Sequence, residues 1–217
     1  MLYWETITKF GDVALLGPVA AAIALWLTFA SKRHMALFWC LSFAGAMSLV
    51  ALTKIAFMGW GVGESHNFTG ISGHTTAACA VIPVLLFLCL QNTRPLIRIY
   101  GVALGILFGI CIGISRLAVE AHSLPEVVAG CMLGCLVSVS FIVFFSPSTP
   151  LSRPTPARPA LALSMVVLFA FSFTDTAPTQ VWLEHIAMAV SGRDKPVVRK
   201  VGLLRNIFHP TEKLCCQ

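Results

Sequence analysis

Charged side chains are scarce in this sequence of 217 residues. It has 15 Lys and Arg and 9 Asp and Glu, or 11% charged residues, whereas a soluble domain carries about 25%. So few charges cannot cover the surface of a soluble globule, which argues against a water-soluble enzyme, a disordered chain or a nucleic-acid-binding protein. The net charge of +6 comes from basic pairs between long apolar runs, a pattern typical of polytopic membrane proteins. The predicted fold class is therefore all-α, a polytopic membrane helix bundle.

The sequence also lacks the spacings that hold metal ions. It contains 8 cysteines but no CxxC pair and no Cys/His ligand spacing. Six of these cysteines lie inside apolar runs, where cysteine behaves as a small hydrophobic residue. No metal site is therefore expected.

Long apolar runs set the number of membrane spans, because crossing a bilayer core takes about 17–25 apolar residues. Five runs qualify, the third and fourth near the minimum length, at residues 13–30, 35–58, 75–90, 99–114 and 127–145. A shorter run, 160–173, is either a sixth span or a helix lying partly in the interface. We thus expect five to six transmembrane helices in a domain over 1–173. In the C-terminal tail, 174–217, residues 181–189 either form a short interfacial helix or belong to a solvated tail.

Loop charges predict the orientation. The loops after the first, third and fifth runs hold Lys32, Arg33, Arg94, Arg98, Arg153 and Arg158. The opposite loops, 60–74 and 115–124, hold only Arg116, so they are predicted to lie outside, in the periplasm or its equivalent. The tail carries six basic residues yet would be external if 160–173 crosses. Either that run does not span, or the tail violates the rule.

Polar and ionisable residues, which are energetically unfavourable at or near membrane depth, are concentrated at these two outer loops. A hairpin of the third and fourth runs returns Ser115-Arg116 to the side of Ser72-Gly73-His74. Lys54, near the end of the second run, belongs to the same side. Histidines with an arginine, a lysine and a hydroxyl suit a phosphate group. Arginine can donate two hydrogen bonds to two phosphate oxygens at once. The N–H groups at a helix N-terminus add more donors, and Gly73 would allow the backbone to approach the phosphate closely.

His122 and Glu126 complete this cluster. Ser123-Leu124-Pro125-Glu126 matches a capping box with proline in the first turn, which predicts that the fifth helix begins there. Glu126 would then bond one ring nitrogen of His122, and the other nitrogen could attack phosphorus. His74 would protonate the leaving oxygen.

These residues also resemble a known family. Residues 115–126 are similar to the SR-x5-H-x3-D motif of the type 2 phosphatidic acid phosphatase (PAP2) superfamily, and Ile71-Ser72-Gly73-His74 resembles its PSGH motif. Lys54 stands where the lysine of the K-x6-RP motif is expected. The sequence departs from the family at Gly61-Val62, which replaces Arg-Pro, at Ile71, which replaces Pro, and at Glu126, which replaces Asp.

The resemblance implies a role for each matching residue. His122 would be the nucleophile that becomes phosphohistidine, Glu126 would orient it, and His74 would be the general acid that later activates water. Arg116, Ser72, the Gly73 amide and Lys54 would bind the phosphate oxygens. No metal and no cofactor are implied, because cationic side chains neutralise the developing charge.

Three functions remain open at this stage. The first is a membrane-embedded phosphatase of lipid phosphates or diphosphates, with undecaprenyl diphosphate the leading substrate and phosphatidic acid or phosphatidylglycerol phosphate next. The second is a phosphotransferase that passes the phosphoryl group to lipid A or another acceptor. The third is a non-catalytic scaffold or transporter with a PAP2-like frame. The expected location is the bacterial inner membrane, with the site facing the periplasm. The expected partners are the lipid substrate and the bilayer, without nucleic acid, and the oligomeric state is left open.

Overall fold

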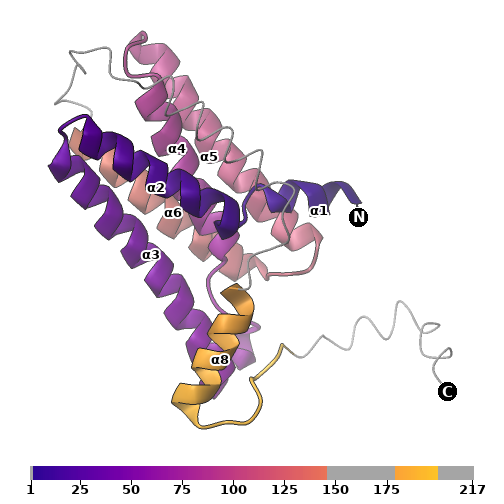
Figure 1. The fold of residues 1–217 in the computed structure, drawn as a ribbon. Coiled ribbons are helices and arrows are strands. Elements are labelled where there is room, and N and C mark those ends of the chain that lie inside the picture. Colours follow the sequence, from indigo (N-terminus) through magenta and orange to yellow (C-terminus); the bar gives the residue numbers. More distant parts are fainter. Residues whose placement is uncertain (1, 146–178, 200–217) are drawn as a thin grey trace.

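The computed structural model describes residues 2–145 and 179–199, which form helices and no strand in those ranges. Figure 1 shows long helices packed side by side, with two short helices beside them. The elements, in chain order, are α1 (Leu2–Lys9), α2 (Val13–Phe29), α3 (Arg33–Trp60), the 3-10 helix η1 (Glu64–His66), α4 (Gly73–Cys89), α5 (Pro95–Ala118), α6 (Leu124–Phe145) and α8 (Thr179–Ser191).

The prediction of an all-α polytopic bundle is confirmed. Each of the five apolar runs up to residue 145 coincides with a helix, α2 to α6. Four segments are long and apolar enough to cross a membrane, namely α1 with α2 (Tyr3–Phe29), α3, α5 and α6. The remaining helix, α4, is apolar but has 17 residues. The run 160–173 lies outside the described residues.

Local signals in the sequence explain where these helices begin and end. Asp12 caps α2, because its side chain accepts a hydrogen bond from the Ala14 N–H at 2.9 Å. Pro95 occupies the first turn of α5, and Gly61, with a φ of +74°, ends α3. The fourth run was predicted to be near the minimum length, but α5 has 24 residues. Hydropathy showed only its apolar part, whereas backbone hydrogen bonding continues the helix through polar residues to Ala118.

The short helix α4 is the centre of the bundle. Most of its side chains are buried, and it packs against α5 and α6. Glycines allow this close approach: a Cβ at Gly105 of α5 would lie 2.8 Å from the Pro83 Cα, and one at Gly134 of α6 would lie 2.5 Å from the Thr76 carbonyl oxygen. Small residues that let helix backbones approach are typical of membrane helix packing. The N-terminus of α4 is thereby fixed between the ends of its neighbours.

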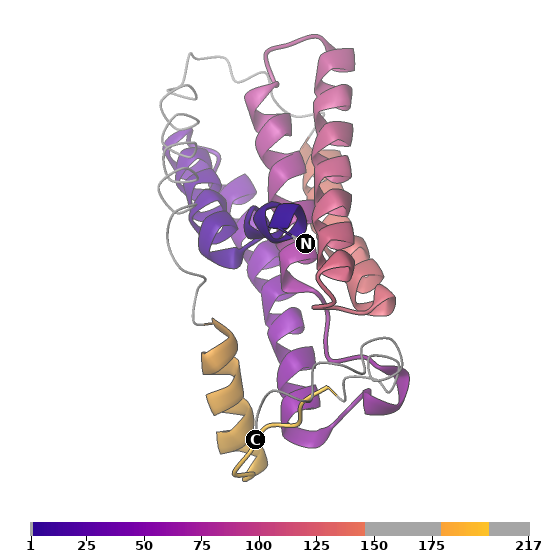
Figure 2. The ribbon, with the colours of Figure 1, turned by 90° about the vertical axis from the view of Figure 1, so that its right-hand side faces the viewer.

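Two short helices flank the end of the bundle where α4 begins. In Figure 2, α1 is seen nearly end-on while α4 and α5 run vertically, so α1 lies across the bundle. It contacts α5, and α8 packs against α3. Ala187 of α8 is fully buried against Phe57 and Met58 at the end of α3. Residues 181–189 were predicted to form either a short interfacial helix or part of a solvated tail, and the structure has a helix there, α8, over a longer stretch.

Candidate active site

A cavity of about 660 Å³ opens at the end of the bundle where α3 and α5 end and α4 and α6 begin. Nine of its lining side chains can ionise or donate hydrogen bonds: Asp12, Lys54, Thr69, His74, Arg116, His122, Thr179, Gln180 and Trp182. Gly73 also lines it. Of the seven predicted site residues, five therefore reach one cavity: Lys54, Gly73, His74, Arg116 and His122.

His122 is held by Glu126, which stands behind it. His122 Nδ1 lies 2.6 Å from Glu126 Oε2, and the two side chains are 7% and 0% exposed. The pair does not lie within one helix, because α6 begins at Leu124, after His122. With Nδ1 engaged by the carboxylate, Nε2 is the ring nitrogen left for a ligand. This is the arrangement of a base or nucleophile oriented by a carboxylate.

Four further hydrogen bonds fix the Glu126 carboxylate itself. The backbone N–H of Ser123 donates to Oε2 at 3.0 Å, which is the glutamate half of the predicted capping box. Oε1 accepts from the Thr69 N–H at 2.5 Å, from the Thr69 hydroxyl at 2.9 Å and from Arg199 Nη2 at 2.5 Å. A buried carboxylate with this many donors is held in place and ionised.

The environment of His122 favours its neutral form. Burial lowers the pKa of His122 from its ordinary value, and the charges of Lys54 and Arg116 act in the same direction. The hydrogen bond to Glu126 opposes this shift. Because burial is the largest of these causes, the imidazole is neutral near pH 7, as a nucleophile must be.

His74 lies on the first turn of α4 and faces an acid from another helix. Its Nε2 is 3.9 Å from Asp12 Oδ2, and the side chains are 24% and 14% exposed. Gly11 makes this approach feasible, because a Cβ there would lie 3.3 Å from the His74 Cβ and would overlap the Ile112 side chain. This carboxylate can orient a proton on Nε2, the proton that a general acid would donate.

Arg116, in the last turn of α5, lines the cavity with a guanidinium group whose hydrogen-bond donors are only partly paired. Its Nη1 donates to the Thr8 hydroxyl of α1 at 3.1 Å. Its Nε is buried with no hydrogen-bond partner in the part of the chain that the structure describes. A buried donor without a partner is unfavourable by about 1–3 kcal/mol, and an anion in the cavity would satisfy it.

Ser72 is the predicted phosphate-binding residue whose side chain does not line the cavity. It is fully buried at the N-cap of α4, and its hydroxyl pairs with the Thr75 hydroxyl at 2.9 Å. The hydroxyl therefore does not cap the helix, and the first N–H groups of α4 have no side-chain cap. The role foreseen for this hydroxyl remains a prediction.

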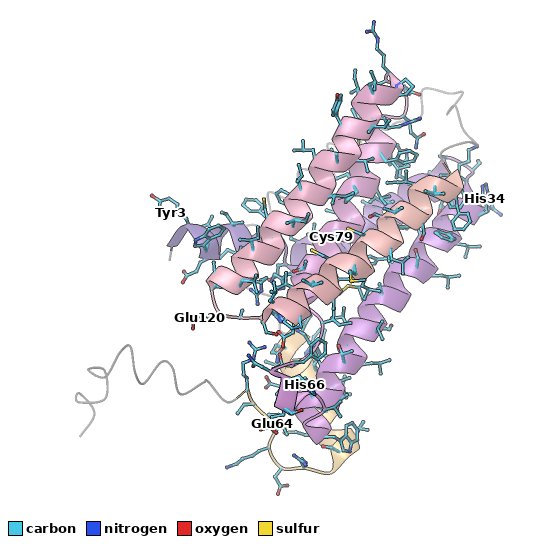
Figure 3. All side chains as sticks on the ribbon, turned by 180° about the vertical axis from the view of Figure 1, so that it is seen from behind. Tyr3, His34, Glu64, His66, Cys79 and Glu120 are labelled. Carbon is cyan, nitrogen blue, oxygen red and sulfur yellow. The ribbon has the colours of Figure 1, made fainter. Side chains whose placement is uncertain are left out.

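Other polar residues of the outer loops lie elsewhere. His66 is exposed and pairs with Ser65 at 2.9 Å, and Figure 3 shows it with Glu64 at one end of the bundle and His34 at the far end. Glu120 is exposed on the loop between α5 and α6. None of these residues lines the cavity.

Sequence reasoning missed four residues that the structure brings to the site: Thr8, Asp12, Thr69 and Arg199. Thr8 and Asp12 come from around the break between α1 and α2, and Arg199 follows α8. Asp12, an acid next to a long apolar run, was a signal that could have been used. The others carry no local pattern, because each meets the site through a contact between distant parts of the chain.

Much of the remaining lining is apolar. Met47, Val50, Phe57 and Met58 of α3 contribute to it, as do Leu183 and Ile186 of α8, while Thr179 and Gln180 of α8 add polar groups. The cavity thus combines the ionisable side chains with walls that suit hydrocarbon. Within the described residues, no group of three or more His, Cys, Asp and Glu side chains is arranged to hold a metal ion.

Comparison with known proteins agrees with this site. A family model of the PAP2 superfamily matches residues 54–150, which include every predicted site residue. The chain is 35% identical over 206 residues to an uncharacterized 22.5 kDa protein in the cps region of Klebsiella pneumoniae, an alignment that covers 90% of this chain and 95% of that protein. No solved structure matches. The fold and the family match define a polytopic membrane protein of the phosphatase class. The chain belongs to the PAP2 superfamily.

Proposed function

We propose that the protein is a membrane-embedded, metal-independent phosphatase of lipid phosphates or diphosphates that works through a phosphohistidine. The observation that carries this proposal is the pairing of His122 with Glu126 at the edge of a cavity shared with His74, Arg116 and Lys54. Such a set supplies a nucleophile, a proton donor and cations for one phosphate group.

In the first step, His122 Nε2 attacks phosphorus while Nδ1–H stays bonded to Glu126. The bond between phosphorus and the leaving oxygen breaks, and His74 gives its proton to that oxygen. Arg116, Lys54 and the N–H groups at the start of α4 stabilise the charge on the equatorial oxygens. In the second step, His74 takes a proton from water, which attacks phosphorus, and the bond to His122 breaks.

The cavity walls support a lipid substrate. A phosphate held near Arg116 would leave its hydrocarbon part against the apolar side chains of α3 and α8. Among such lipids we favour undecaprenyl diphosphate, followed by phosphatidic acid and phosphatidylglycerol phosphate. The basic loops at the opposite end of the bundle, with Lys32, Arg33, Arg94 and Arg98, favour an inner-membrane location with the site facing the periplasm.

The test is phosphate release in detergent from each lipid, with and without EDTA. We expect turnover that EDTA leaves unchanged. We expect His122→Ala and His74→Ala each to lower kcat by about a hundredfold or more, the scale of losing a nucleophile or a general acid. His66→Ala, which changes an exposed histidine away from the cavity, serves as the matched control and should retain full activity.

The same assay separates the other two functions. A phosphotransferase would consume the lipid diphosphate without releasing an equal amount of inorganic phosphate, and would do so only when an acceptor lipid is added. A scaffold or transporter would show no turnover with any lipid. Full activity in His122→Ala would contradict the proposed mechanism.

A further inference from the structure

We propose that Arg199, from the segment after α8, is a positioning residue that holds the Glu126 carboxylate against the nucleophile His122. This inference rests on the proposed function. It assigns a part in catalysis to the tail, at a residue 54 positions after the last residue of α6.

The contact is direct and mostly buried. Arg199 Nη2 lies 2.5 Å from Glu126 Oε1 and 3.2 Å from the Thr69 hydroxyl, which itself donates to the same oxygen. The Glu126 side chain is 0% exposed and that of Arg199 is 23% exposed. Little water therefore screens the pair, so the cation strongly favours an ionised carboxylate in one orientation.

The carboxylate divides its two oxygens between two tasks. Oε1 accepts hydrogen bonds from Arg199 and Thr69, and Oε2 accepts them from His122 Nδ1 and the Ser123 N–H. Fixing Oε1 leaves the carboxylate no freedom to rotate away from the imidazole. Arg199 does not line the cavity, so it acts on the reaction through Glu126 and not through the phosphate.

The fold carries Arg199 to this place by a chain of contacts along α3. Helix α8 lies close to the end of α3, where a Cβ at Gly59 would approach the Ser191 Cβ to 3.3 Å. After α8 the chain turns back, and the Val197 N–H donates to the Met58 carbonyl at 2.8 Å. The Val197 side chain packs against the same small cluster as Met58 and Ala187. Two residues later the chain reaches Glu126.

Arg199 also places a positive charge beside Glu126, the carboxylate that is hydrogen-bonded to His122. The charged and titratable groups around His122 and Glu126 are Lys54 of α3, His74 of α4, Arg116 of α5 and Arg199, with Asp12 beyond His74. Removing Arg199 deletes one positive charge next to the carboxylate. The remaining negative charge then stabilises protonated His122 more strongly, so the acid side of the pH profile moves to higher pH.

The experiment measures kcat, KM and the pH profile of kcat/KM for lipid phosphate hydrolysis by the full chain in detergent. Arg199→Gln should lower kcat by about tenfold to a hundredfold, the range found when a residue that orients a metal-binding side chain is removed, taken here by analogy. KM should change little, and the acid limb should move up by about one pH unit. Arg193→Gln, which removes an exposed cation of the same segment, is the matched control and should match the wild type.

Two further variants protect the test against misfolding. Arg199→Lys keeps the charge and replaces a contact made through one nitrogen, so it should retain activity within about threefold of the wild type. In a Glu126→Gln background, Arg199→Gln should cause no further loss, because residues that act as one unit are not additive.

The outcomes separate this inference from the proposed function. A wild type without phosphatase activity contradicts the proposed function and this inference with it. An active wild type whose Arg199→Gln variant is unchanged contradicts only the inference. So does a variant with raised KM and unchanged kcat whose effect adds to that of Glu126→Gln, because Arg199 would then bind substrate. Equal losses in Arg199→Lys and Arg199→Gln would also overturn it, because a charge that orients Glu126 should be replaced in part by lysine.

Discussion

Glu126→Gln replaces the carboxylate that orients His122 by an amide of nearly the same shape. In the native site both oxygens accept hydrogen bonds only: Oε2 from His122 and Ser123, and Oε1 from Thr69 and Arg199. An amide has one accepting oxygen and one donating nitrogen. Whichever way it is placed, its NH2 group meets donors on one side, so the substitution disrupts one half of the network.

The magnitude follows from which half is lost. The amide oxygen is best placed toward the cation of Arg199, which leaves the NH2 group facing His122 Nδ1. The imidazole must then accept at Nδ1 and carry its proton on Nε2, so the nitrogen that should attack phosphorus is blocked. In a serine protease triad, the same carboxylate-to-amide change imposes the wrong tautomer and lowers kcat by about 10⁴. We expect a loss of about 10³ to 10⁴ in kcat.

Stability should fall much less than activity. Losing a hydrogen bond to a charged group lowers the free energy of unfolding by about 1.5–3 kcal/mol. The assay is phosphate release from a lipid diphosphate by folded protein, with thermal unfolding measured in the same detergent. Glu120→Gln removes an exposed carboxylate from the adjacent loop and should behave as the wild type. Glu126→Gln with kcat within threefold of the wild type would refute the reasoning about the tautomer.

Three further predictions follow from the structure. Because burial lowers the pKa of His122, the unfolded chain binds a proton there at higher pH than the folded chain. The acid limb of kcat/KM, corrected for ionisation of the substrate, should therefore lie below about pH 6.5. Thermal unfolding should also occur at lower temperature as the pH falls below that value. An acid limb above pH 6.5 would contradict this prediction. Asp12→Asn keeps the N-cap of α2 but removes the carboxylate facing His74, so kcat should fall about threefold to fivefold in steady-state assays at unchanged thermal stability. An unchanged kcat would argue against a role for that contact. A side chain at Gly105 would overlap the backbone of α4. Gly105→Val should therefore lower the free energy of unfolding by about 1–3 kcal/mol in denaturant titrations. Gly17 has open space around it, so Gly17→Val should change the free energy of unfolding less.

The sequence contained enough information for the spans and most of the catalytic core. Apolar length located α2 to α6, since burying hydrocarbon requires runs that a hydropathy count detects. The number of membrane crossings alone predicted that the C-terminal end of α5 and the N-terminal end of α4 lie on the same side. The capping signal at Ser123 and Glu126 marked the start of α6 within one residue, and spacing paired Glu126 with His122.

The remainder depends on contacts that leave no local pattern. Arg199 meets Glu126 across a separation of 73 residues, and Arg116 meets Thr8 across 108. In the sequence, Arg199 was one of six basic residues in a tail, and nothing distinguished it. The hydroxyl of Ser72 was assigned to phosphate by its motif, yet it pairs with Thr75, one turn further along α4. Position in a motif does not fix the rotation of a side chain.

The central claim is that His122 forms a covalent bond to phosphorus, and trapping that intermediate tests it most directly. The protein is mixed with a lipid phosphate labelled with ³²P at the reacting group, quenched in alkali within one turnover, digested and analysed by mass spectrometry. The account predicts an acid-labile, alkali-stable phosphoryl group on His122 that is absent from His122→Ala and persists longer in His74→Ala, in which water is not activated. A protein that turns over substrate yet carries its label on another residue, or carries none during turnover, would contradict the account.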